Sequence, residues 1–113
     1  MEINKEIGEQ IQELQLLEGN IQAISMEKQA LQVDLNEINN SLDEIKRSGD
    51  EIYKILNGIM LKASKESLNK DLSERKKVAE MRISSIEKQE KSVEERANSL
   101  RKEINSSFSA KKG

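Results

Sequence analysis

The sequence contains no proline, cysteine, histidine or tryptophan, and its only aromatic residues are Tyr53 and Phe108. Without cysteine there is no disulfide, no thiolate nucleophile and no cysteine-ligated zinc. Without histidine, the commonest general base and the commonest metal ligand are both missing. Two aromatic rings are too few for the core of an ordinary globular domain, because such cores depend on large rings for buried area. We therefore expect neither an enzyme nor a compact globular fold.

Glycine motifs, net charge and long apolar runs are also lacking. The five glycines are scattered, so there is no glycine-rich phosphate loop, and no acidic loop has the spacing of a calcium site. We expect no metal and no cofactor. The net charge of −2 argues against a general nucleic-acid binder. No apolar run approaches the roughly 20 residues that span a bilayer, and the start lacks a secretory signal. These absences predict a soluble cytoplasmic protein with no nucleic-acid or membrane partner.

What the sequence does contain is a heptad pattern in two long segments, which is typical of a coiled coil. Over residues 3–45, eleven of 13 seam positions are apolar, and they alternate four and three residues apart. Residues 65–107 show a weaker seam, so we expect the second helix to depend on the first for burial. The strong seam comprises Ile3, Ile7, Gln10, Leu14, Leu17, Ile21, Ile24, Lys28, Leu31, Leu35, Ile38, Leu42 and Ile45. The weak seam comprises Leu72, Lys76, Ala79, Ile83, Ile86, Glu90, Val93, Ala97, Leu100 and Ile104.

The ends of the two helices carry local signals. We predict a first helix over residues 1–48, closed by Gly49 in the left-handed conformation. Ser64 is a good N-cap for a second helix over residues 65–108, followed by a short tail at 109–113. The whole chain is then one domain, in which the segment between the helices differs from both of them.

That segment, residues 50–64, is predicted to form a β-hairpin. Asn57-Gly58 between apolar residues is the strongest short hairpin signal. With this two-residue turn, residues whose numbers sum to 115 face each other, and both faces of the hairpin hold apolar side chains. A lone hairpin is marginal in water and has two open edges. We therefore interpret the segment as an assembly module that hairpins of other chains cover. The alternative is a plain loop that joins the helices.

A turn at this place makes the two helices antiparallel, and their charges agree. Residues 1–48 hold ten acidic and four basic residues, whereas residues 65–113 hold nine acidic and 13 basic ones. An acidic helix beside a basic one favours this pair over self-association of the first helices. The same register places Lys28, the charged residue of the strong seam, near Glu87 and Glu90. Lys28 either covers apolar neighbours with its stem while its ammonium reaches water, or fixes the register.

Both termini fall at the end opposite the hairpin, where Ile3, Ile7 and Ile11 meet Ile104 and Phe108. A helix end with only one neighbouring helix cannot fully bury such side chains. Exposed apolar residues gathered at a tip indicate contact with another molecule. Frayed termini also carry unburied apolar residues, so both interpretations stay open.

The order of helix, hairpin and helix resembles the prefoldin beta subunit family, in particular its archaeal form. The hairpin region carries most of the resemblance, with Ile52-Tyr-Lys before the turn and Ile59-Met-Leu-Lys62 after it. The stretches Ile24-Ser-Met-Glu-Lys-Gln-Ala-Leu31 and Ile86-Glu-Lys-Gln-Glu90 agree as well. The family pattern has Gly-Asn at the turn where this chain has Asn57-Gly58, which suits a type I′ turn equally well.

The resemblance implies a mostly α-helical subunit, an antiparallel two-helix coiled coil whose hairpin joins an oligomeric β-barrel platform. It implies a hetero-hexamer of two alpha and four beta subunits, an ATP-independent holdase that passes unfolded clients to a group II chaperonin. The implied assembly residues are Ile52, Tyr53, Ile55, Leu56, Ile59, Met60 and Leu61. The implied client-binding tips are Ile3, Ile7, Ile104 and Phe108. The alternative function is a structural coiled-coil scaffold without chaperone activity.

Overall fold

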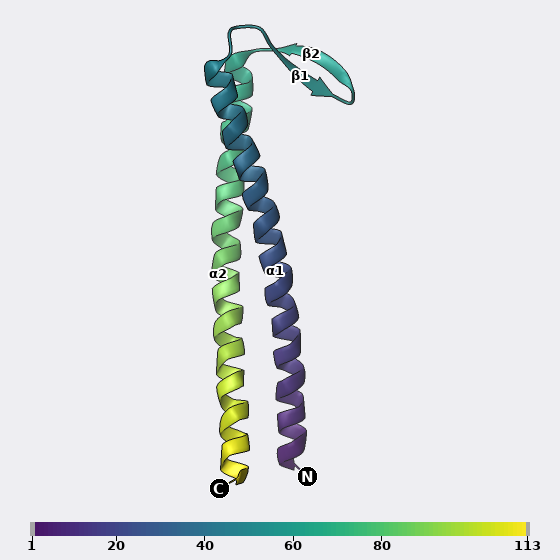
Figure 1. The fold of residues 1–113 in the computed structure, drawn as a ribbon, viewed down its shortest axis with the longest axis vertical. Coiled ribbons are helices and arrows are strands. Elements are labelled where there is room, and N and C mark those ends of the chain that lie inside the picture. Colours follow the sequence, from purple (N-terminus) through teal and green to yellow (C-terminus); the bar gives the residue numbers. More distant parts are fainter. Residues whose placement is uncertain (1, 113) are drawn as a thin grey trace. The chain divides into compact units, whose positions relative to one another are not determined.

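The computed structural model describes residues 2–112, and it describes side chains for residues 5–109. Along the chain lie helix α1 (Glu2–Arg47), strands β1 (Ile52–Leu56) and β2 (Ile59–Ala63), and helix α2 (Lys65–Lys112) (Figure 1). The chain divides into two compact units. The first contains Met1–Lys28 with Ser85–Gly113, and the second contains Gln29–Ser84. The predicted fold class, two long helices and an antiparallel two-stranded hairpin, is confirmed.

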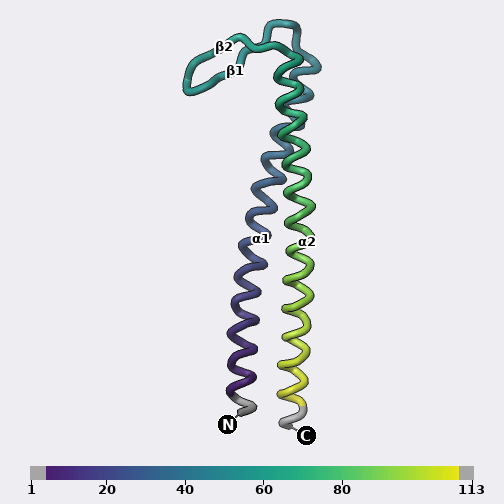
Figure 2. Tube along the Cα trace, turned by 180° about the vertical axis from the view of Figure 1, so that it is seen from behind, coloured from purple at the N-terminus to yellow at the C-terminus, as the bar shows by residue number. Residues whose placement is uncertain are grey.

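In the first unit, segments of α1 and α2 run side by side in opposite directions (Figure 2). Their apolar seam lies between them, because a heptad spacing keeps one side of each helix facing its neighbour. Every seam position predicted from the sequence is buried or half-buried wherever its side chain is described. Leu100 is the largest fully buried side chain. The buried residues of this unit are Ile7, Ile24, Ile86, Ala97, Leu100 and Ile104.

Ion pairs in the first unit agree with the predicted antiparallel register. Arg96 donates from Nε to Glu13 Oε1 over 3.1 Å, and Arg101 Nη2 lies 3.5 Å from Glu18 Oε1. Gln10 donates to Glu103 over 3.0 Å. In the two ion pairs the acid belongs to α1 and the arginine to α2, as the charge difference between the helices predicts. These groups are largely exposed, so each pair selects the register more than it adds stability.

In the second unit, the other segments of α1 and α2 pack on Ile38, Ile45 and Ala79, all buried. The end of α1 differs from its prediction, because the φ angle of Gly49 is not positive. Ser48 closes the helix instead: its N–H donates to the Glu44 carbonyl over 3.0 Å and its hydroxyl to the Ile45 carbonyl over 2.9 Å. Lys65 Nζ in turn donates to the Ser48 carbonyl. With these carbonyls satisfied, no left-handed glycine is needed.

The start of α2 confirms its predicted cap, and its end extends beyond the predicted one. Ser64 Oγ accepts a hydrogen bond of 2.9 Å from the N–H of Ser67, which is the N-cap geometry. The helix continues through residues 109–112, which we had predicted to be a tail. Alanine and lysine are good helix formers, and the chain has no proline that would end the helix within these residues.

Lys28 sits in the seam of the first unit and bonds to the two residues predicted for it. Its Nζ donates to Glu90 over 3.2 Å and lies 4.0 Å from Glu87. Both the Lys28 and Glu90 side chains are largely removed from water, which strengthens the pair relative to a surface pair. The ammonium is therefore held by the opposite helix rather than free in solvent, and this favours the register-fixing interpretation.

We expect Lys28→Glu to destabilise the helix pair by about 1–3 kcal/mol, because three carboxylates then share one partly buried site. Urea unfolding followed by helical circular dichroism measures this change. Lys5→Glu, an exposed lysine-to-glutamate change on the same helix, is the control and should have little effect. Equal effects of the two changes would contradict a specific role for Lys28.

Candidate functional site

The hairpin is the first candidate surface, and its pairing follows the predicted sum rule at every position. Ile52 faces Ala63, Ile55 faces Met60, and Leu56 faces Ile59. Asn57 and Gly58 have φ angles of 51° and 78°, and positive values at both turn residues define a type I′ turn. This turn has the twist of the strands that it joins, so the local sequence sets the register without help from the helices.

Both faces of the hairpin are apolar and open to solvent. Because side chains alternate across a strand, one face carries Tyr53, Ile55, Met60 and Lys62. The other face carries Ile52, Lys54, Leu56, Ile59, Leu61 and Ala63. Every residue from 53 to 62 is exposed, and only Ile52 and Ala63 at the base are half-buried. Six of the seven predicted assembly residues therefore lie together on an exposed surface, with Ile52 beside them.

The edges of the hairpin are open as well as its faces. Within the described residues the sheet consists of β1 and β2 alone, so each strand pairs on one side only. The outer N–H and C=O groups of both strands can pair with further strands. In Figures 1 and 2 the hairpin extends to one side of the helices of its own unit, and those helices do not cover its faces. The hairpin thus presents two apolar faces and two open strand edges.

The paired ends of the helices form the second candidate surface, and its exposure differs in part from the prediction. Phe108 is 47% exposed, which agrees with an open apolar tip, but Ile7 and Ile104 are only 7% and 8% exposed. The prediction that Ile7 and Ile104 are exposed is therefore wrong, and the reason is their position in the heptad. Both isoleucines occupy seam positions, where one facing helix is enough to cover them. The side chain of Ile3 lies outside the described residues.

Sequence reasoning missed one exposed apolar residue near this end. Leu16 is 71% exposed, more than either Phe108 or the nearby Ile11. Its position in the heptad was the available signal, because Leu16 falls two places after the seam residue Leu14. An apolar residue there points away from the partner helix.

Among the side chains that the structure describes, at residues 5–109, no group of three or more carboxylates is arranged to hold a metal ion. Over the same residues neither helix contains a stretch long and apolar enough to cross a bilayer. A groove beside α2 in the second unit is lined by Leu31, Val78, Ala79 and charged residues, among them Arg75, whose Nη2 lies 3.6 Å from Asp34.

Comparison with known proteins agrees with this geometry. Residues 8–111 match the family described as Prefoldin subunit. The fold is similar to that of the prefoldin beta subunit from Thermococcus strain KS-1, with a TM-score of 0.83 and 27% sequence identity. That similarity covers 89% of this chain and 90% of the Thermococcus chain. No curated protein matches the sequence.

Proposed function

Since this chain belongs to the prefoldin subunit family and is of the beta type, we propose that it is a subunit of an ATP-independent holdase chaperone. It assembles with alpha subunits into a hetero-hexamer of two alpha and four beta chains. The complex works in the cytoplasm, where it binds unfolded proteins and passes them to a group II chaperonin. No step of this function needs a nucleophile, a metal or a nucleotide.

The observation that carries the proposal is the hairpin, apolar on both faces and open at both edges. An isolated hairpin of this kind gains most by pairing with other hairpins, which bury its faces and complete its edges. The assembly residues are Ile52, Tyr53, Ile55, Leu56, Ile59, Met60 and Leu61. A closed platform of such strands brings several coiled coils together in one particle.

Client binding is assigned to the paired helix ends. Phe108 and Ile11 are the apolar side chains that this surface offers to a client, and Ile3 belongs to the same end by its position in the sequence. Ile7 and Ile104 pack between the helices and support the end from inside. Single contacts of this size are weak, but several linked arms that bind one client add through effective concentration.

A light-scattering experiment separates this function from the alternative, a structural scaffold. A chemically unfolded protein is diluted into buffer with and without the complex assembled from this chain and an alpha-type subunit. We expect the complex to suppress aggregation without ATP at roughly equal molar amounts, because each particle offers several linked contacts. Aggregation that proceeds unchanged would support the scaffold instead.

The client-binding end can be tested in the same assay with one substitution. Phe108→Asp should weaken protection, because it removes the exposed ring and adds a charge that an apolar client must desolvate. Val78→Asp makes the same kind of change at an exposed position in the second unit and should have no effect. Equal protection by both variants and the unchanged complex would place the client site elsewhere.

A further inference from the structure

The outward side of α1 in the first unit is unlike that of an ordinary coiled-coil helix. Between residues 12 and 26, the positions that point away from α2 carry no charge at all. We call this surface the neutral face. All of its residues are exposed, and Leu16 and Met26 are 71% and 65% exposed. It consists of the amides Gln12, Gln15 and Gln22 and the apolar residues Leu16, Ala23 and Met26.

The corresponding side of α2 in the same unit shows what such a surface usually carries. Its outward positions, counted at the same heptad places over residues 88–102, are four charged residues, two serines and one asparagine, as expected for a helix side that only meets water. The charged residues there are Lys88, Lys91, Glu95 and Lys102. Solubility therefore does not explain the neutral face, because the neighbouring helix of the same unit achieves it with charges.

Two of the carboxylates that flank the neutral face are paired, and two further ones, Glu9 and Glu27, stand at its ends. Glu13 and Glu18 lie beside the neutral face, and each is paired with an arginine of α2, Arg96 at 3.1 Å and Arg101 at 3.5 Å. Between these ends the face itself offers no free counter-ion to a charged ligand. An uncharged ligand would have no carboxylate to desolvate.

The chemistry of the neutral face matches that of an unfolded polypeptide. Such a chain exposes apolar side chains together with peptide N–H and C=O groups. Leu16 and Met26 offer apolar contact, and the glutamine amides both donate and accept hydrogen bonds. Gln12, Gln15 and Leu16 border a shallow, open depression on this face. The neutral face can therefore bind an extended, uncharged segment through both kinds of group, its side-chain amides and its apolar side chains.

The size of the neutral face favours an unfolded client over a folded partner or a second copy of this chain. Fifteen helical residues span about 22 Å, so one side of such a helix offers on the order of 500 Å² of accessible surface. A stable complex with a folded partner or a second copy needs roughly 800 Å² on each side. A surface of this size supports only weak, rapidly exchanging contacts. Such contacts are what a holdase requires, because it must release its clients.

We propose that the neutral face of α1 is an additional client-binding surface, which takes uncharged apolar segments of unfolded polypeptides. This inference rests on the proposed holdase function and adds a second contact surface to the helix ends. Two properties follow. Binding at this face is insensitive to ionic strength, and it is lost when Leu16 and Met26 become charged.

A site-specific cross-linking experiment tests the proposal, because the chain has no cysteine and an introduced one is unique within it. Gly19→Cys places a thiol-reactive benzophenone among the neutral-face residues, and no neighbouring atom lies within 4 Å of a Cβ at this position. Ser92→Cys on the outward side of α2 is the matched control. The labelled chain is assembled with its alpha-type partner and irradiated with reduced, carboxymethylated α-lactalbumin, a soluble chain that does not refold.

We expect at least about fivefold more cross-linked client from position 19 than from position 92. The yield from position 19 should not change in about 0.5 M NaCl, because the contacts of the neutral face involve no charges. Adding Leu16→Lys and Met26→Lys should lower the yield about tenfold, because two apolar contacts are lost. Lysine is a good helix former, so helical circular dichroism should stay unchanged. Equal yields at positions 19 and 92, or cross-links from position 19 to a second copy, would overturn the proposal.

The outcome is distinguishable from a failure of the holdase function itself. If the unmodified complex suppresses aggregation but position 19 captures no client, the assignment of client binding to the neutral face is wrong and the proposed function stands. If the unmodified complex gives no protection in the light-scattering assay, the holdase function fails first, and the neutral face as a client site fails with it.

Discussion

Ile55→Asp combined with Met60→Lys is expected to abolish the large assembly while both helices stay folded. The two residues face each other across the strands and are exposed in the single chain. If hairpins of other chains cover them, each apolar side chain contributes about 1.5–3 kcal/mol when it is buried. The substitutions remove that contribution and place charges in the interface, where desolvating them is costly. The effect is repeated in every copy of the subunit.

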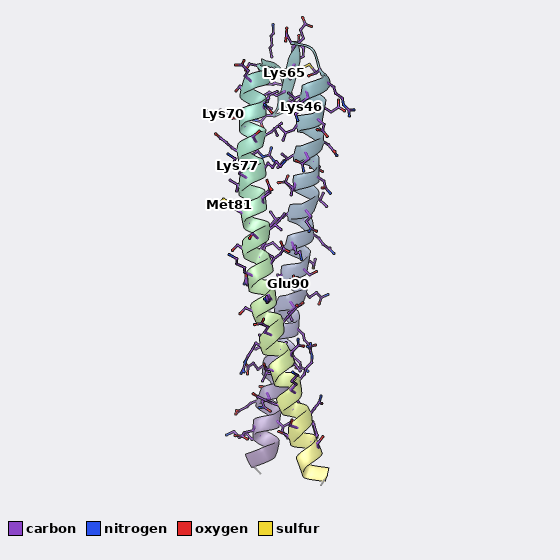
Figure 3. The ribbon with its side chains drawn as sticks, turned by 90° about the vertical axis from the view of Figure 1, so that its left-hand side faces the viewer. Lys46, Lys65, Lys70, Lys77, Met81 and Glu90 are labelled. Carbon is purple, nitrogen blue, oxygen red and sulfur yellow. The ribbon has the colours of Figure 1, made fainter. Side chains whose placement is uncertain are left out.

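Size-exclusion chromatography with circular dichroism measures this result. The double variant should elute as a much smaller species and keep its helical signal. Val78→Asp with Met81→Lys is the matched control, because both of these residues are exposed on α2 and Met81 projects from its outward side (Figure 3). The control should assemble normally. An assembled hairpin variant would show that the helices, rather than the hairpin, hold the subunits together.

Leu100→Ala should give the largest loss of stability of any single truncation in the first unit. Leu100 is 1% exposed and packs in the seam between α1 and α2. Removing its isobutyl group forfeits burial and leaves a cavity, at a typical cost of about 2–5 kcal/mol. A two-helix unit has few other buried side chains to compensate. We expect a large shift of the urea midpoint, followed by circular dichroism.

Leu16→Ala is the matched control for this experiment. It makes the same chemical change in the same unit at an exposed position, so its effect on stability should stay within about 0.5 kcal/mol. A client-binding defect in this control would not disturb the comparison, because urea unfolding measures folding alone. Similar losses for the two leucines would contradict the packing described for the seam.

The elements that could be predicted from the sequence are those governed by local rules. The Asn57-Gly58 turn determines its own strand register, so all five strand pairs follow from one dipeptide. The heptad spacing identifies the buried side of each helix. The antiparallel register then follows from the hairpin and places Lys28 near Glu87 and Glu90, as found.

The features that could not be predicted depend on which groups meet in space. Ser48 and Lys65 satisfy the last carbonyls of α1, and this removed the need for the left-handed Gly49 that its position had suggested. Ile7 and Ile104 are buried although they lie near the helix ends, because a single facing helix covers a seam position. Neither outcome is visible in a pattern of residue types, since both need the placement of a second segment.

For this protein, the sequence by itself determined the elements, their order and their register, because turn chemistry and hydrophobic periodicity act within a few residues. It also excluded cysteine and histidine chemistry. Only the tertiary structure decided which apolar residues remain free to bind another molecule. Burial depends on the neighbouring helix, which covers Ile7 and Ile104 and leaves Phe108, Leu16 and both faces of the hairpin exposed.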